Sequence, residues 1–69
     1  MKAREIGRRI ERLGGQMVRQ RGSHRLYRAT GDGLMAQTVV PQHSGDVPRG
    51  TQRSIERDLE PIFGKDWLS

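Results

Sequence analysis

QMVRQRGSHRLYRATGDGLMAQTVVP, residues 16–41, has the pattern of alternating strands and turns from which the fold is predicted. It holds three short segments rich in strand-forming residues: residues 16–21, 24–30 and 34–40. Gly22-Ser23 separates the first two segments, and TGDG at residues 30–33 separates the second from the third. Asp32-Gly33 favours a hairpin turn because both residues tolerate positive φ. Three strands joined by links this short predict an antiparallel meander.

A helix is predicted before the strands, at residues 2–13. Its apolar side chains recur at spacings of three, four and three on a segment otherwise covered in charge: Ala3, Ile6, Ile10 and Leu13. This spacing places them on one stripe, which we expect to pack in the core. Gly14 and Gly15 then end the helix, since glycine readily adopts the left-handed geometry that closes one.

A second helix is predicted after the strands, beyond a loop rich in turn-forming residues. We expect it to begin near Gly50-Thr51, with Thr51 as its cap. Pro61 fits poorly in a helix interior, so the helix should end or kink near Leu59. Alternatively, the proline starts a further turn that carries the apolar residues beyond it over the core: Ile62, Phe63 and Trp67.

The element order is therefore helix, strand, strand, strand, helix. We expect one α+β domain spanning residues 1–69, with both helices on one face of a three-stranded antiparallel sheet. Successive side chains of a strand point to opposite faces of the sheet. Each strand contains a pair of neighbouring apolar residues, and the two members of a pair must lie on different faces: Met17-Val18, Leu26-Tyr27 and Val39-Val40. The face without helices should expose some apolar surface, which is typical of an interaction site.

Basic residues are concentrated in the first half of the chain. Nine of the 13 Lys and Arg residues, but two of the eight acidic residues, lie at or before Arg28, and the net charge is +5. Guanidinium groups pair with phosphate oxygens and release counterions. This charge distribution therefore favours binding of a nucleic acid or another polyanion. The alternative interpretation is a surface that is basic only for solubility. No apolar run approaches the roughly 20 residues that span a bilayer, and the N-terminus lacks the apolar middle of a secretion signal. We therefore expect a cytoplasmic protein without a membrane partner.

Few catalytic chemistries fit the sequence. It contains no glycine-rich phosphate loop before a helix, no HExxH motif and no carboxylate cluster suited to magnesium. His24 and His43 are the only imidazoles and make a poor zinc site in a chain without cysteine, so we expect neither a metal nor another cofactor. A small protein can catalyse RNA cleavage without a metal ion, because the ribose 2′-hydroxyl of the substrate is itself the nucleophile.

The segment RQRGSHRLYR, residues 19–28, offers the groups that such a reaction needs. His24 suits proton transfer. Three arginines are candidates for holding the phosphate: Arg21, Arg25 and Arg28. Gly22 permits close approach of an RNA backbone, Ser23 can donate a hydrogen bond, and Tyr27 can stack on a base.

Each of these candidates also has a plainer interpretation. His24 can be a polar surface residue, Gly22-Ser23 a simple turn, and Tyr27 a half-buried sheet residue. His43 can simply hydrogen-bond the loop that follows it. The residues alone thus indicate a small basic nucleic-acid-binding domain, with or without nuclease activity.

Four segments with recognisable motifs follow one another along the chain: KAREI, LGGQMVRQRGSHRLYR with its G-S-H-x-x-Y core, TVVPQH and GTQRSI. Together they resemble the HicA family, the ribonuclease half of a bacterial toxin–antitoxin pair, over most of the chain. The C-terminal stretch IERDLEPIFGKDWLS departs from the family pattern, in which the second helix leads to a small residue, a glycine and an apolar residue.

The resemblance implies a fold similar to the double-stranded RNA-binding domain and metal-independent cleavage of messenger RNA, which inhibits translation. The family's catalytic histidine falls at His24, and its motif glycine and serine fall at Gly22 and Ser23. His43 matches a family position with an assisting or structural role. A HicB-type antitoxin that covers the active site is the implied partner.

Two other classes compete with a ribonuclease toxin. One is a non-catalytic RNA-binding module of the same fold. The other is a small DNA-binding regulator, which is disfavoured because acidic residues dilute Arg53 and Arg57 in the second helix.

Overall fold

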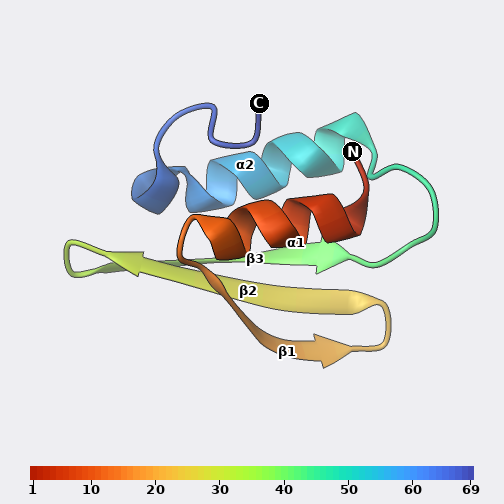
Figure 1. Cartoon of the computed structure of the whole chain (residues 1–69), viewed down its shortest axis with the longest axis horizontal. Helices are drawn as coiled ribbons and strands as arrows, with labels where there is room; N and C mark the ends of the chain where they lie inside the picture. Colours follow the sequence, from red (N-terminus) through yellow and green to blue (C-terminus); the bar gives the residue numbers. More distant parts are fainter.

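The computed structural model describes residues 1–69 and has the order helix, three strands, helix (Figure 1). The elements are α1 (Ala3–Arg12), β1 (Gln16–Arg21), β2 (His24–Gly31), β3 (Leu34–Pro41) and α2 (Arg49–Phe63). The strands form one antiparallel sheet in the order β1-β2-β3, and both helices lie on one face of it. The expected α+β architecture is confirmed. No helix is long and apolar enough to cross a bilayer.

α1 begins and ends within one residue of the predicted helix. At its start, the Glu5 carboxylate accepts a 2.8 Å hydrogen bond from the backbone N–H of Lys2. The apolar stripe is buried at three positions: Ala3, Ile6 and Ile10. The prediction that Leu13 joins them is wrong. Leu13 lies beyond the last helical residue, where the chain turns toward β1, and it is 45% exposed.

α2 is longer than the sequence predicts. Pro48 occupies its N-cap position and no side chain caps it by a hydrogen bond, so Thr51 is not the cap. The helix also continues through Pro61, and the predicted end near Leu59 is wrong. Pro61 falls in the last turn, where its missing N–H removes a single backbone hydrogen bond and little helix follows. The backbone N–H of Gly64 then donates to the carbonyl of Glu60 at 2.8 Å.

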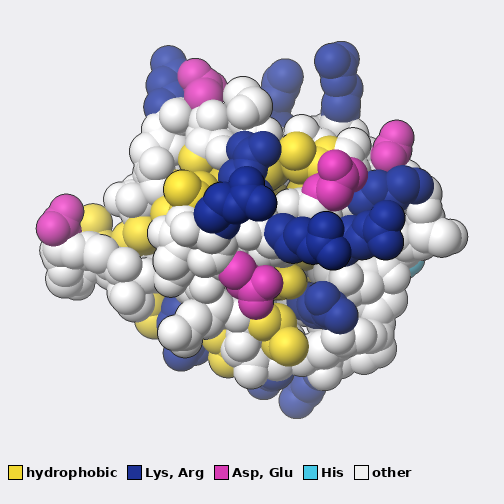
Figure 2. Space-filling model, in the orientation of Figure 1, with side chains coloured by type: hydrophobic (Ala, Val, Ile, Leu, Met, Phe, Trp, Pro, Cys, Tyr) yellow, Lys and Arg dark blue, Asp and Glu magenta, His cyan; other side chains and the backbone are white.

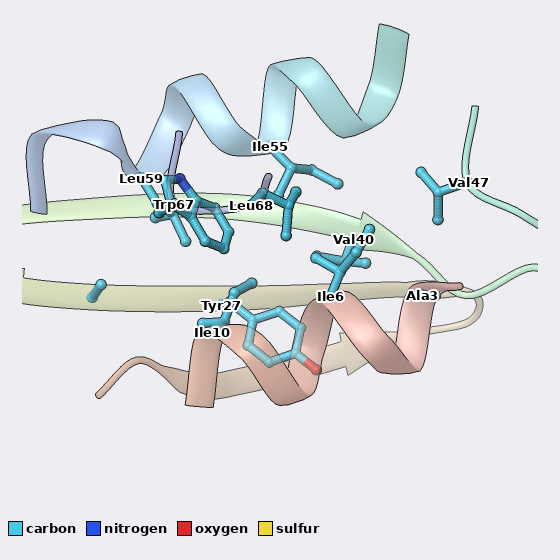
Figure 3. Close-up of a cluster of buried hydrophobic side chains, with 11 residues drawn as sticks. Ala3, Ile6, Ile10, Tyr27, Val40, Val47, Ile55, Leu59, Trp67 and Leu68 are labelled. Carbon is cyan, nitrogen blue, oxygen red and sulfur yellow. The ribbon is translucent and has the colours of Figure 1, made fainter. Parts of the chain in front are cut away.

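One core fills the space between the helices and the sheet (Figure 3). Eleven apolar residues are buried in it: Ala3, Ile6, Ile10, Tyr27, Ala29, Val40, Val47, Ile55, Leu59, Trp67 and Leu68. α1 approaches the sheet closely, as shown by the collision that a Cβ at Gly7 would make with the hydroxyl of Tyr27 on β2. Thr38 is buried beside these apolar residues and donates a 2.9 Å hydrogen bond to the Asp58 carboxylate of α2.

The segment after α2 returns to the core, as the alternative interpretation of Pro61 anticipates. Trp67 and Leu68 are buried, and the Phe63 and Trp67 rings meet edge to face with centroids 5.2 Å apart. The indole N–H of Trp67 donates a 2.7 Å hydrogen bond to the backbone carbonyl of Glu56. The Trp67 carbonyl in turn accepts a 3.1 Å hydrogen bond from Arg9 of α1. The C-terminal segment thus ties the two helices together.

The second face of the sheet has no helix over it. Alternation along β2 and β3 places Tyr27 and Val40 in the core and turns Leu26 and Val39 outward. Met35 and Val39 are 59% and 46% exposed. The expected apolar surface on the face without helices is therefore present. We call it the open face.

Candidate active site

One end of the molecule gathers segments that are distant in the chain. The β1–β2 turn, the end of β3 and the start of α1 all lie there (Figure 1). The turn consists of Gly22 and Ser23, and Gly22 adopts a positive φ of 54° that favours glycine. The backbone N–H of Gln42 donates to the carbonyl of Ser23, which fastens the turn to the segment after β3. This bond fixes the position of His24, the first residue of β2.

The two imidazoles of the chain meet at this end. His24 is paired with Pro41 across the sheet, and His43 follows two residues after Pro41. The His24 and His43 rings stand edge to face at an interplanar angle of 82°, with their centroids 6.5 Å apart. Both side chains are exposed. The site therefore presents two imidazoles, the side chains that most often serve as general acids and bases in enzymes.

His24 belongs to a shallow hollow on the open face. The hollow has a volume of about 120 Å³ and is lined by Arg19, Arg21, His24, Leu26 and Val39. Arg21 lies opposite His24 and Arg19 opposite Leu26 in the β1–β2 register, which places these side chains on one face. Two guanidinium groups thus stand beside His24, where they can attract an anion.

His43 belongs to a larger hollow at the start of α1. Its volume is about 410 Å³, and its lining residues are Lys2, Ala3, Arg4, Gln42, His43, Ser44 and Gly45. Lys2 and Arg4 supply positive charge there. The histidine pair consequently lies between two hollows, each of which contains two cations besides its histidine.

Of the arginines predicted as phosphate ligands, the structure brings Arg21 alone into the hollow of His24. Arg25 lies on the face opposite to His24, is half-buried, and donates a 2.8 Å hydrogen bond to Gln20. Arg28 shares the face of His24 but lies four residues further along β2. Its guanidinium donates hydrogen bonds of 2.9 and 2.7 Å to the Gln37 side chain.

The base-stacking role predicted for Tyr27 does not fit its position. Tyr27 is 2% exposed and its ring packs in the core beside α1 (Figure 3). It follows Leu26, which faces outward, so the strand alternation turns Tyr27 toward the helices. Gly22 and Ser23 do lie in the turn beside His24, and nothing within 4 Å would meet a Cβ at Gly22. The backbone at Gly22 is therefore not covered by other groups of the chain.

Sequence reasoning missed Arg19, Lys2 and Arg4. The sequence does contain a signal for Arg19. A two-residue turn at Gly22-Ser23 pairs Arg21 with His24 across the hairpin. Because side chains alternate between the faces of a strand, Arg19 then lies on the same face as Arg21 and His24. No such local signal exists for Lys2 and Arg4. They reach His43 only through the packing of α1 against the sheet. No three His, Asp or Glu side chains are grouped so that they could hold a metal ion.

The fold and this end of the molecule define a small basic α+β domain with two exposed imidazoles between cation-lined hollows. A family model described as the HicA toxin of bacterial toxin–antitoxin systems matches residues 3–60. The chain therefore belongs to the HicA toxin family, and its role is that of a toxin with a cognate antitoxin as partner. A search of curated proteins and a search of solved structures each found no match. The matched range includes His24 and His43 and ends before Pro61.

Proposed function

We propose that the protein is an endoribonuclease that cleaves messenger RNA without a metal ion, with His24 and His43 as its two proton-transfer groups. The observation that carries the proposal is the approach of the two rings, whose centroids are 6.5 Å apart. Catalytic hydrogen bonds are about 2.6–3.2 Å long, so two imidazoles at this separation can reach different oxygens of one phosphodiester.

The reaction begins with attack of the ribose 2′-hydroxyl oxygen on the adjacent phosphorus. One imidazole, in its neutral form, accepts the proton of the hydroxyl as the O–P bond forms. The bond from phosphorus to the 5′-oxygen breaks, and the second imidazole, in its protonated form, gives a proton to that oxygen. The products are a 2′,3′-cyclic phosphate and a 5′-hydroxyl. Every atom and electron pair is supplied by the RNA and the two side chains.

Negative charge accumulates on the phosphate oxygens in the transition state. Arg19 and Arg21 in the hollow of His24 are placed to stabilise it, since fixed cations act most strongly where charge develops. Gly22 leaves space for the RNA backbone, and Ser23 can donate a hydrogen bond to it. Arg25 and Arg28 are better explained as sheet residues that hydrogen-bond Gln20 and Gln37.

Family membership and charge support the choice of substrate and partner. A toxin acts on a cell component, and a chain with 13 basic and eight acidic residues favours a polyanion. Cleavage of messenger RNA in the cytoplasm would inhibit translation. A HicB-type antitoxin that covers His24 and meets its arginines with acidic groups would neutralise this activity.

The test is an analysis of reaction products in the presence of a metal chelator. The purified protein is incubated with a single-stranded RNA and with DNA of the same sequence. RNA fragments that end in a 2′,3′-cyclic phosphate, with the DNA left intact, are the expected result. If a folded protein binds the RNA and leaves it intact, it is a non-catalytic RNA-binding module instead.

A further inference from the structure

α1 carries a basic surface that begins beside His43, at Arg4, and extends beyond the histidine site. Arg4, Arg8 and Arg12 follow one another at intervals of four residues, so their side chains lie on one side of the helix. All three are exposed. At about 1.5 Å of rise per residue, they extend over about 12 Å. We call these three residues the α1 row.

The fold itself does not account for the α1 row. The arginines whose side chains hydrogen-bond within the chain are Arg9, Arg25 and Arg28. The ion pair of the structure joins the N-terminal ammonium to Asp46, so the row takes no part in one. Like charges four residues apart destabilise a helix. Arg9, by contrast, is half-buried and donates to the Trp67 carbonyl, which is a structural role.

The row leads away from the histidine pair. α1 starts at the end of the molecule where His24 and His43 meet, and it runs toward the opposite end (Figure 1). Arg4 lines the hollow that contains His43. Arg8 and Arg12 line a further hollow of about 210 Å³ beside Met1, Glu5 and Arg9. Figure 2 shows Lys and Arg side chains gathered over α1, with acidic groups beside them.

We infer that the α1 row binds the phosphates of a single-stranded RNA that extends from the histidine pair along α1. This inference deepens the proposed function, since it assigns the path of the substrate on one side of the cut. Cations spaced along a line hold a polyanionic strand without regard to its base sequence. The row therefore contributes affinity at a distance from the reacting phosphate.

The composition of the helix surface favours RNA over a protein partner at this position. The exposed residues of α1 are all charged: Arg4, Glu5, Arg8, Glu11 and Arg12. A protein interface has an apolar core depleted in charge, and α1 offers none. The open face does offer exposed apolar residues, Met35 and Val39, which suit a protein. An antitoxin seated on the α1 row is the competing outcome.

The test measures RNA affinity against salt concentration. A His24→Ala background prevents cleavage during titration with a fluorescent single-stranded RNA. One variant adds Arg8→Gln and Arg12→Gln, and the matched control adds Arg53→Gln and Arg57→Gln on α2. Both pairs remove two exposed arginines spaced by four residues, and Gln keeps helix propensity. Circular dichroism melting shows whether each variant is folded.

Each lost contact with a single strand should reduce the slope of log K against log salt by about 0.7. The α1 variant should therefore lose affinity and show a shallower slope than the background, whereas the α2 control keeps most of its slope. Equal slopes in both variants overturn the inference. So does an α1 variant that binds RNA normally but no longer binds the cognate antitoxin. RNA binding is measured here without cleavage, so the two proposals can fail separately. A wild type that does not cut RNA contradicts the proposed function but does not change the measured binding of RNA by the α1 row.

Discussion

The imidazole rings of His24 and His43 stand edge to face with centroids 6.5 Å apart, although β2 and β3 separate the two residues along the chain. The antiparallel pairing of β2 with β3 brings the start of one strand beside the end of the other. The hydrogen bond from the Gln42 N–H to the Ser23 carbonyl then holds the segment of His43 against the turn of His24. A pair of imidazoles is a stronger acid–base catalyst than a single one, because each step of a phosphodiester transfer needs both a donor and an acceptor.

The rate of RNA cleavage should depend on pH as a bell-shaped curve. Activity falls on the acidic side because the base becomes protonated, and on the alkaline side because the acid loses its proton. Replacing His43 by Ala should remove one limb of the curve and leave the other. Initial rates measured from acidic to alkaline pH at constant ionic strength check this. An unchanged bell in the variant would show that His43 takes no part in proton transfer.

The cations beside His24 should act on the transition state. Arg21→Gln should lower kcat/KM by about 10²-fold, as loss of one positioned charge-stabilising group does in other enzymes. Arg25→Gln is the matched control, because its side chain lies on the other face of β2 and donates to Gln20. Steady-state kinetics on one RNA substrate compare the two variants. Equal losses in both would mean that total charge, and not position in the hollow, determines the rate.

The C-terminal segment should be required for stability. Trp67→Ala removes a buried indole, together with its contact with the Phe63 ring and its 2.7 Å hydrogen bond to the Glu56 carbonyl. The expected loss is about 3–5 kcal/mol of the free energy of unfolding. Leu13→Ala, at a position 45% exposed, should cost far less. Urea denaturation measures both. Similar losses for the two variants would contradict the assignment of Trp67 to the core.

The closeness of α1 to the sheet should depend on the absence of a side chain at Gly7. A methyl group there collides with the Tyr27 hydroxyl, so Gly7→Ala should destabilise the fold by about 1–3 kcal/mol, although alanine is the better helix former. Tyr27→Phe removes the hydroxyl oxygen, so the double variant should lose less stability than the sum of the single variants. Strict additivity of the two changes would mean that these groups do not meet.

Local sequence patterns were sufficient to predict most of the fold. The predicted strands match β1, β2 and β3 to within one residue, because Gly22-Ser23 and Asp32-Gly33 mark both turns. α1 follows from its apolar spacing. α2 was predicted too short, since the rule against proline in helices applies to a helix interior and Pro61 lies in the last turn.

The candidate site was predictable only in part. The motif around His24 lies on one hairpin, so its turn and its neighbour Arg21 follow from the sequence. The motif also suggests Arg25 and Tyr27 for the site, but strand alternation turns both away from the face of His24. The approach of His43, Lys2 and Arg4 depends on how α1 and the loop after β3 pack together, and no local pattern encodes that contact.

The role of the histidine pair is tested by comparing cleavage of a single-stranded RNA, in the presence of a chelator, by the wild type, His24→Ala and His43→Ala. RNA binding and thermal melting are measured in parallel. Each variant should bind RNA and melt like the wild type, while its cleavage rate falls by about 10²–10⁴-fold. Cleavage that survives both substitutions would contradict the role of the histidine pair. So would a folded wild type that binds RNA without cutting it.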